Sequence, residues 1–396
     1  MTSISGLYAS VIGGSGNEIF GGNYSAILGG QNNGVGAMWS TISGGGNNNI
    51  YIGDGEFIAG GNGNTIYGVA WNNGFNTVGG GQYNLISNMS RCVIGGGQNN
   101  VIKSESVPPY AHTIGGGIGN MIYLTNPSLA ANTIVGGYCN GMTNCYGSTI
   151  SGGANNSITG AYESVVSGGA GNTVYGSGNG IASGAGNVVT GQYSAVAGGN
   201  NNRAVGTCAT VLGGYYNVAT GSYSVAAGYR AAALQGSFVF AGATSGLTNS
   251  AINQFWVKAP GGTRFISNDA GTTGVELPAG GNGWNVLCDR KLKHDAKMVQ
   301  SKQALEAVMM LNVETFHTDA GKDAAERPVY LGIMANEFND ALESLGADRN
   351  VTAEGYNTVD TTAAMAMSVA AIQAQQVQIK ALQEEISQLR AQLAQR

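Results

Sequence analysis

Apolar and polar positions recur in a fixed order along the first two thirds of the chain. Each copy reads apolar, apolar or small, Gly, Gly, two variable residues and Asn, followed by apolar residues and often another Gly, as in residues 165–176. The Asn that follows the second Gly by three positions marks thirteen copies, spaced 15, 16 or 20 residues apart. These residues are Asn17, Asn33, Asn48, Asn64, Asn84, Asn100, Asn120, Asn140, Asn156, Asn172, Asn187, Asn202 and Asn217. The spacing indicates a repeat protein.

A unit this short cannot bury its own apolar side chains, so each copy must stack on the next. Residues 25–28 and 172–175 have the β-branched and aromatic content of strands, and Gly-Gly permits the positive φ of a tight corner. The sequence therefore predicts a mainly β fold, a narrow parallel β-roll or β-solenoid. Its stacked Asn amides would bond to one another and to the corner backbone.

Several copies are lengthened, among them the segments 103–111 and 124–131. These segments are the contact points that we expect to meet a ligand. A flexible Gly/Asn-rich linker would not keep apolar pairs in phase with Gly-Gly through thirteen copies. A calcium-binding roll needs an Asp in every turn, and Asp54 is the only Asp in residues 1–240.

Composition divides the chain near residue 288. The protein has 67 Gly and 6 Pro, and positions 1–287 carry only 13 of its 39 charged residues. There is no basic stripe to predict a nucleic-acid partner. The N-terminus lacks a basic segment followed by an apolar one, and no run approaches the roughly 18 apolar residues of a membrane span. We expect neither signal-dependent export nor membrane insertion.

We expect three segments: the roll over 1–235, a β-rich neck over 236–287 and an α+β domain over 288–396. We expect the six aromatic residues of the neck to pack in its core, with a sugar-binding platform as the alternative. These residues are Phe238, Phe240, Phe255, Trp256, Phe265 and Trp284. Helical spacing predicts helices over 302–311 and 334–345. Met365, Ile372, Ile379, Ile386 and Leu393 recur every seven residues and predict a coiled coil over 361–396.

The repeats resemble the heads of trimeric autotransporter adhesins, in which left-handed rolls pack around a common axis. Two C-terminal segments, Leu287-Cys288-Asp289-Arg290-Lys291-Leu292-Lys293 and Leu331-Gly332-Ile333-Met334-Ala335-Asn336-Glu337, resemble the chaperone of endosialidase domain, also called the S74 peptidase domain. That resemblance implies a homotrimer, although Ile and Leu in these heptad positions by themselves favour two strands. It also implies an intramolecular chaperone that is released by self-cleavage.

The resemblance places the catalytic nucleophile at Cys288, where the family has Ser. Lys293 would lower the pKa of the Cys288 thiol or accept its proton, and Asp289 would shape the scissile turn. An uncleaved trimerisation cap with a buried Cys288 is the alternative. The chain is thus an enzyme at most towards itself.

Other candidate chemistry is sparse. We interpret four cysteines as buried small residues: Cys92, Cys139, Cys145 and Cys208. The histidines, which are His112, His294 and His317, have no partner at metal-ligand spacing. We therefore expect no metal and no cofactor. Asp54 and Glu56 would share one side of a strand, which we interpret as a solvated edge.

The favoured function is a bacteriophage tail fibre or tailspike component, located in the virion, that meets a host cell-surface glycan or receptor and other tail proteins. A bacterial trimeric adhesin at the cell surface is the alternative. A glycan-degrading tailspike is disfavoured because the roll has too few carboxylates for the pair that a glycosidase needs.

Overall fold

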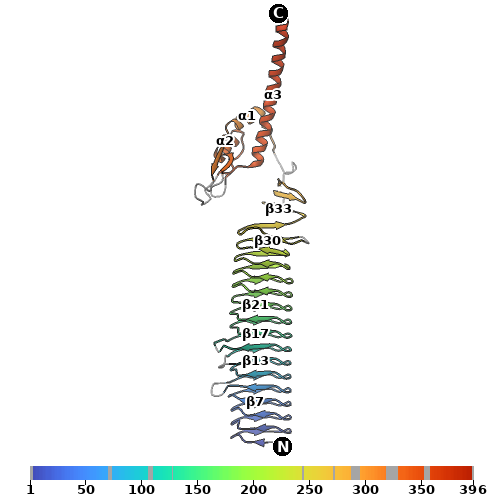
Figure 1. Ribbon diagram of the computed structural model, residues 1–396, viewed down its shortest axis with the longest axis vertical. Helices are drawn as coiled ribbons and strands as arrows, with labels where there is room; N and C mark the ends of the chain where they lie inside the picture. The colour runs from blue at the N-terminus through green and yellow to red at the C-terminus, as the bar shows by residue number, and fades with distance from the viewer. Residues whose placement is uncertain are drawn as a thin grey trace. The chain divides into compact units, whose positions relative to one another are not determined.

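The computed structural model describes residues 3–69, 74–105, 110–126, 128–242, 245–270, 273–286, 295–317, 329–351 and 357–394. It consists of two compact units, Met1–Leu287 and Cys288–Arg396. The first unit is a parallel β-solenoid of about 15 turns, which confirms the predicted mainly β roll (Figure 1). The second contains three helices and a short sheet among its described residues.

Each turn of the solenoid contributes one strand to each of two 16-stranded parallel sheets. Sheet A consists of β1 (Ser3–Ile4), β3 (Glu18–Ile19), β5 (Gly34–Val35), β7 (Asn49–Ile52), β9 (Thr65–Tyr67), β11 (Leu85–Ser87), β13 (Val101–Ser104), β15 (Met121–Leu124), β17 (Gly141–Thr143), β19 (Ser157–Thr159), β21 (Thr173–Tyr175), β23 (Val188–Val189), β25 (Arg203–Ala204), β27 (Val218–Ala219), β29 (Ala231–Ala233) and β31 (Leu247–Thr248). Sheet B consists of β2 (Ser10–Val11), β4 (Ala26–Ile27), β6 (Thr41–Ile42), β8 (Phe57–Ile58), β10 (Thr77–Val78), β12 (Val93–Ile94), β14 (Thr113–Ile114), β16 (Thr133–Ile134), β18 (Thr149–Ile150), β20 (Val165–Val166), β22 (Gly180–Ile181), β24 (Ala195–Val196), β26 (Thr210–Tyr215), β28 (Val225–Tyr229), β30 (Phe238–Ala241) and β32 (Phe255–Lys258).

The core is a stack of apolar side chains, one from each sheet in each turn. In sheet B, Ile42 pairs with Ile58 in the next turn, and in sheet A, Ile50 pairs with Ile66. All four are fully buried. Because side chains alternate across a strand, the residues on either side of each Ile point outward. The sequence phase of the Ile and Val pairs therefore fixes the register of the whole stack.

One corner of every turn depends on the second Gly of the Gly-Gly step. Gly97 has a φ of +86°, and a Cβ atom there would lie 2.1 Å from the carbonyl oxygen of Gly117 in the next turn. The preceding residue, Gly96, has no atom within 4 Å of the position that a Cβ would take. Only one glycine of each pair is thus required for the close approach of successive turns.

The predicted Asn column is present beside this corner and is buried throughout. The Asn120 amide donates to the Oδ1 atom of Asn100 at 3.1 Å and to the carbonyl oxygens of Gly116 and Gly137 at 2.9 and 3.0 Å. Its own Oδ1 atom accepts the backbone N–H of Asn140 at 3.0 Å. Each amide thereby satisfies backbone groups that the corner would otherwise leave buried and unpaired.

The two parallel sheets continue beyond residue 235, as far as β31 and β32, before an antiparallel sheet begins. That sheet contains β33 (Gly262–Ile266), β34 (Gly274–Pro278) and β35 (Asn285–Val286). The expected core packing of the neck aromatics is wrong for Phe255, Phe265 and Trp284, which are more than half exposed. Outward-facing positions, not interior ones, hold these rings.

The second unit contains α1 (Ser301–Met309), β36 (Val313–His317), β37 (Val329–Ile333), α2 (Ala335–Ser344) and α3 (Thr361–Ala394). The helices predicted over 302–311 and 334–345 are thus confirmed, and α3 is the helix of the predicted coiled coil, whose association with other chains stays a prediction. Phe338 of α2 is fully buried in a small core to which α1 and α3 also contribute. The Asp360 carboxylate accepts the backbone N–H groups of Thr362 and Ala363 at 2.7 and 3.2 Å and so caps the start of α3.

Candidate functional site

The predicted cleavage residues Cys288, Asp289 and Lys293 lie outside the described residues, as does His294. Their roles stay predictions. The second motif of the resemblance forms strand β37 followed by the first turn of α2. Glu337 in that turn accepts the backbone N–H and the side-chain amide of Asn312 at 3.0 and 3.1 Å, which lowers the pKa of its carboxyl group.

The lengthened copies place all their additional residues at one corner of the solenoid. These residues follow β9, β13 and β15 of sheet A and precede the next strands of sheet B. Strand register is kept across them, because Val101 pairs with Met121 and Thr113 with Thr133. The solenoid thus presents loops along one corner without interrupting its core.

A second buried polar column runs inside this loop-bearing corner, and the sequence analysis missed it. Ser40 is typical, since its hydroxyl accepts the backbone N–H of Glu56 in the next turn at 3.1 Å. The column comprises Ser25, Ser40, Glu56, Asn76, Cys92, His112, Asn132, Ser148, Ser164, Asn179, Ser194, Ser224 and Ser237, and the apolar Ala209 takes the same position in one turn. Its residues vary in type, so only their constant position, one residue before each sheet B strand, could have revealed it.

Glu56 occupies this column and is buried, which corrects the prediction that it lies on a solvated edge. Its carboxylate accepts the backbone N–H of Asn76 at 2.6 Å and the Asn76 amide at 3.2 Å. Burial raises the pKa of Glu56 to about 8, against the opposing effect of these hydrogen bonds. Asp54 lies at the surface beside it. Because the Glu56 carboxyl group is enclosed, the two cannot flank a glycosidic bond.

His112 is a second ionisable group inside the column. Its Nδ1 atom accepts the backbone N–H of Asn132 at 3.3 Å, whereas Nε2 is buried without a hydrogen-bond partner. Burial lowers the pKa of His112 to about 4, so the ring is neutral at physiological pH. The neighbouring Cys92 thiol is also buried, and its pKa is raised to about 12. A neutral imidazole beside an un-ionised thiol is a packing arrangement and not an activated nucleophile.

The remaining cysteines divide between interior and surface. Cys145 is buried as predicted, but Cys139 and Cys208 are exposed, which corrects that prediction. Both exposed cysteines occupy corner positions with positive φ, 52° and 53°, where the side chain points away from the core. Within the described ranges, no group of three or more His, Cys, Asp and Glu side chains could hold a metal ion.

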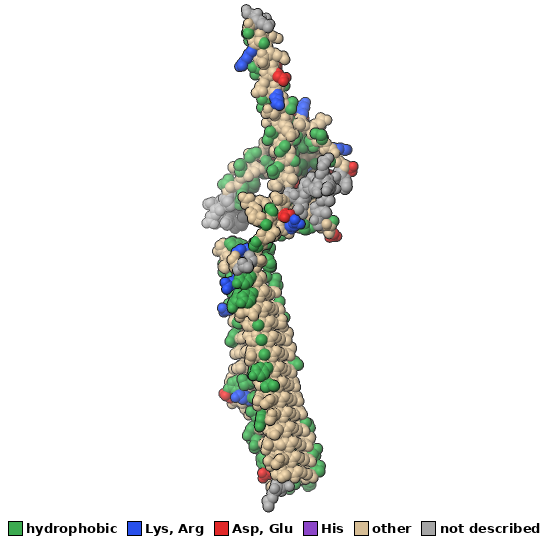
Figure 2. Space-filling view, turned by 90° about the vertical axis from the view of Figure 1, so that its right-hand side faces the viewer, with side chains coloured by type: hydrophobic (Ala, Val, Ile, Leu, Met, Phe, Trp, Pro, Cys, Tyr) green, Lys and Arg blue, Asp and Glu red, His purple; other side chains and the backbone are tan. Residues whose placement is uncertain are grey.

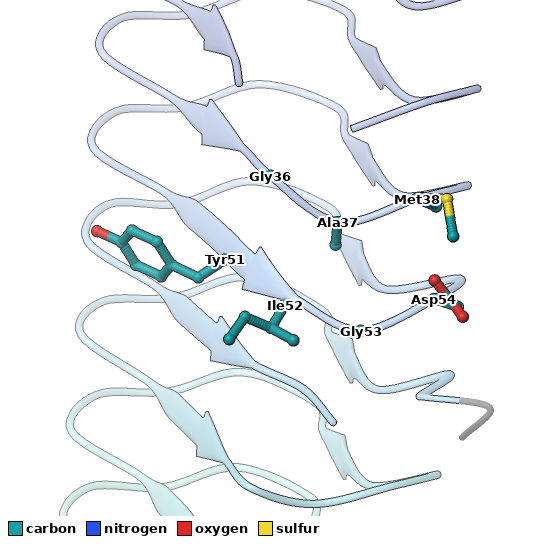
Figure 3. A pocket seen from close by; sticks show the side chains of 7 residues that line it. All are labelled: Gly36, Ala37, Met38, Tyr51, Ile52, Gly53 and Asp54. Carbon is teal, nitrogen blue, oxygen red and sulfur yellow. The ribbon is translucent and has the colours of Figure 1, made fainter. Parts of the chain in front are cut away.

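An open groove crosses the early turns next to the loop-bearing corner (Figure 3). It encloses about 280 Å³ and is lined by Gly36, Ala37, Met38, Tyr51, Ile52, Gly53 and Asp54. The Tyr51 ring lies at one end of the groove, and Met38 and Asp54 lie at the other. The groove therefore offers an aromatic ring and a carboxylate to the same ligand.

The long helix α3 has an exposed apolar seam. Its heptad residues Ile372, Ile379, Ile386 and Leu393 are between 47% and 72% exposed. Met367, by contrast, packs into the small core of the second unit. No helix in the part of the chain that the structure describes has the length and apolar character needed to cross a membrane.

No family model matches the chain, and no curated protein matches it significantly.

Proposed function

We propose that this protein is a homotrimeric fibre of a bacteriophage tail that attaches the particle to the host surface. The solenoid would form the shaft, and residues 288–396 would act as an intramolecular chaperone. The proposal depends on two surfaces that a single chain leaves exposed, and on the resemblance of the C-terminal motifs.

The outer face of sheet B is the observation that carries the proposal. From β2 to β30, no strand of this sheet contains a charged residue, whereas sheet A contains Glu18, Lys103 and Arg203. Most outward positions hold Thr, Ser, Gly or Ala, with Val135 and Leu212 more than half exposed. Figure 2 shows a side of the solenoid on which charged side chains are few. Another molecule can cover such a face without burying an unpaired charge.

The repeat itself favours a second copy of the chain as the partner of this face. Any protein that follows the face through many turns must repeat with the same rise as the solenoid. Other copies of the chain do so by construction. The exposed seam of α3 independently requires helices of the same heptad period. Three copies would cover sheet B and leave sheet A and the loop-bearing corner free to meet the host.

Light scattering after size-exclusion chromatography tests the assembly. One chain has a mass of 40.2 kDa, so the proposal requires about three times this value for the uncleaved protein. Thr149→Glu places a charge on the face of sheet B, and Thr159→Glu, on sheet A, is the control. The first variant should reduce assembly, and the second should not. A monomeric or dimeric wild-type protein would overturn the trimeric fibre.

A further inference from the structure

The early turns carry aromatic side chains at a strained corner position. This position directly precedes each residue of the second polar column and has positive φ in every turn, for example 58° at Tyr24 and 50° at Trp39. Left-handed backbone is costly for a bulky residue, at about 1–3 kcal/mol. Later turns use Gly147, Gly178 or Gly236 at the same place. The early aromatics are thus not needed to form the corner.

The aromatic side chains of this corner form an exposed row. The rings of Tyr8 and Tyr24 stack with their centroids 5.0 Å apart, and Tyr24 and Trp39 follow at 6.1 Å. Phe75 continues the row, and its ring lies where a side chain at Gly55 would be. Each of the four is more than half exposed. Rings held in a row and facing water are a surface for stacking with another molecule.

A second aromatic row lies at the Tyr51 end of the groove. Tyr51 and Tyr67 stack at 4.5 Å, and Phe20 lies 6.1 Å from Tyr51. The Phe20 ring lies against Gly36 of the next turn, 2.5 Å from the position that a Cβ would take there. The groove spans from Tyr51 of this second row to Met38 and Asp54, and Met38 directly precedes Trp39 of the first row.

The charge of this region restricts the ligand. No Lys or Arg precedes Arg91 in the sequence, and the only charged residues of the early turns are Glu18, Asp54 and Glu56. Such a surface repels polyanions and has no cation to bind a carboxylate or sulfate. The C–H faces of a neutral sugar match the aromatic rings, and its hydroxyl groups can donate to the Asp54 carboxylate.

We propose that this groove, together with the corner row next to its Asp54 end and with Trp39, Tyr51 and Asp54 as the main contacts, binds a neutral polysaccharide. This inference rests on the proposed attachment function and names its ligand class and its place. A strand of sugars lying along the rows would meet equivalent rings in successive turns, so longer oligosaccharides should bind more tightly than short ones.

Binding of the full-length protein to a printed panel of neutral glucans, mannans and galactans tests the proposal, with polygalacturonate and hyaluronate as acidic probes. We expect binding to at least one neutral glycan and to neither acidic one. Trp39→Gly should weaken that binding by roughly tenfold or more, and Asp54→Ser should also weaken it. Both replacements occur naturally at the corresponding positions of other turns, Gly55 and Ser90, so the corner should still form.

Tyr193→Gly is the matched control, because Tyr193 has the same corner conformation in a turn far from the groove. It should bind like the wild type. No binding to any neutral glycan, binding to acidic probes alone, or equal loss in both Gly variants would overturn the groove assignment. Light scattering on the same samples separates the two proposals: a trimer without glycan binding rejects only the groove, whereas a glycan-binding monomer rejects only the trimeric fibre.

Discussion

Single residues determine how closely successive turns approach, and the two glycines of one Gly-Gly step should respond oppositely to substitution. Gly97→Ala would place a Cβ 2.1 Å from a backbone oxygen, at a residue whose φ is +86°. Neither the close contact nor the strained backbone conformation can relax unless the two turns separate. We expect a loss of more than about 4 kcal/mol in the free energy of unfolding. Gly96→Ala should change it by less than about 1 kcal/mol. Denaturant unfolding of both variants at one protein concentration measures the difference.

Glu56 should make stability fall as the pH rises. Its pKa of about 8 in the folded chain lies above the ordinary value of 4.5, so between these values the folded state holds a proton that the unfolded state has released. The free energy of unfolding therefore decreases as the pH rises from about 4.5 to 8. Glu56→Ser, which installs the usual residue of the column, should abolish the loss of stability between about pH 6.5 and 8. An unchanged thermal-midpoint profile would contradict the burial of this carboxyl group.

His112 should act in the opposite direction at lower pH. Its pKa of about 4 in the folded chain lies below the ordinary value of 6.5, so the unfolded state binds a proton first as the pH falls. The contribution of His112 to stability should decline from about pH 6.5 towards 4, and above about pH 4.5 it offsets the opposite contribution of Glu56. His112→Asn, which installs the residue that the same column has at Asn76 and Asn132, should remove this decline. Thermal midpoints at pH 4, 5.5 and 7 for wild type and variant measure it.

At the scale of elements, the seam of α3 should control assembly. Ile386→Asp would place a charge in the apolar seam, whereas Ala391→Asp places the same charge on the helix face away from it. If copies associate through the seam, the first variant should fail to assemble as it folds and be recovered as monomers or insoluble chains, whereas the second should assemble. Sedimentation or light scattering distinguishes them. Equal behaviour of the two variants would show that α3 contributes no interface.

The strands of the solenoid were predictable wherever one position of the repeat admits a single type of side chain. The Ile and Val pairs, the second Gly and the Asn of each copy recur because each has one packing or hydrogen-bonding solution, and the roll follows from them. The second polar column was not predictable, because Ser40, Glu56 and His112 all supply an acceptor to the next backbone N–H and no residue type repeats. Exposure of Cys139 and Cys208 was missed for a related reason: their corner positions accept Gly, Asn, Tyr or Cys alike.

At the scale of the whole molecule, the repeat creates a folding problem. Hydrogen bonds in both columns join residues mostly 15, 16 or 20 positions apart, and many turns are alike enough to pair one turn out of register. In the proposed trimer, three chains would also have to align along sheet B, which would multiply these alternatives. A unit that fixes the chain ends together at one end would reduce the search, because each correct turn then templates the next.

This role predicts that residues 288–396 are needed for assembly and not for stability afterwards. A gene ending at residue 287 should give mostly insoluble chains, whereas proteolytic removal of the same segment from the folded fibre should leave its melting midpoint unchanged. If Cys288 cleaves the chain, the purified protein should lack about 108 C-terminal residues in its intact mass, and Cys288→Ala should retain them. A full-length wild-type chain would mean that the segment stays as a cap. Equal yield of folded fibre without it would show that the solenoid finds its register unaided, through the Asn column and the lengthened turns alone.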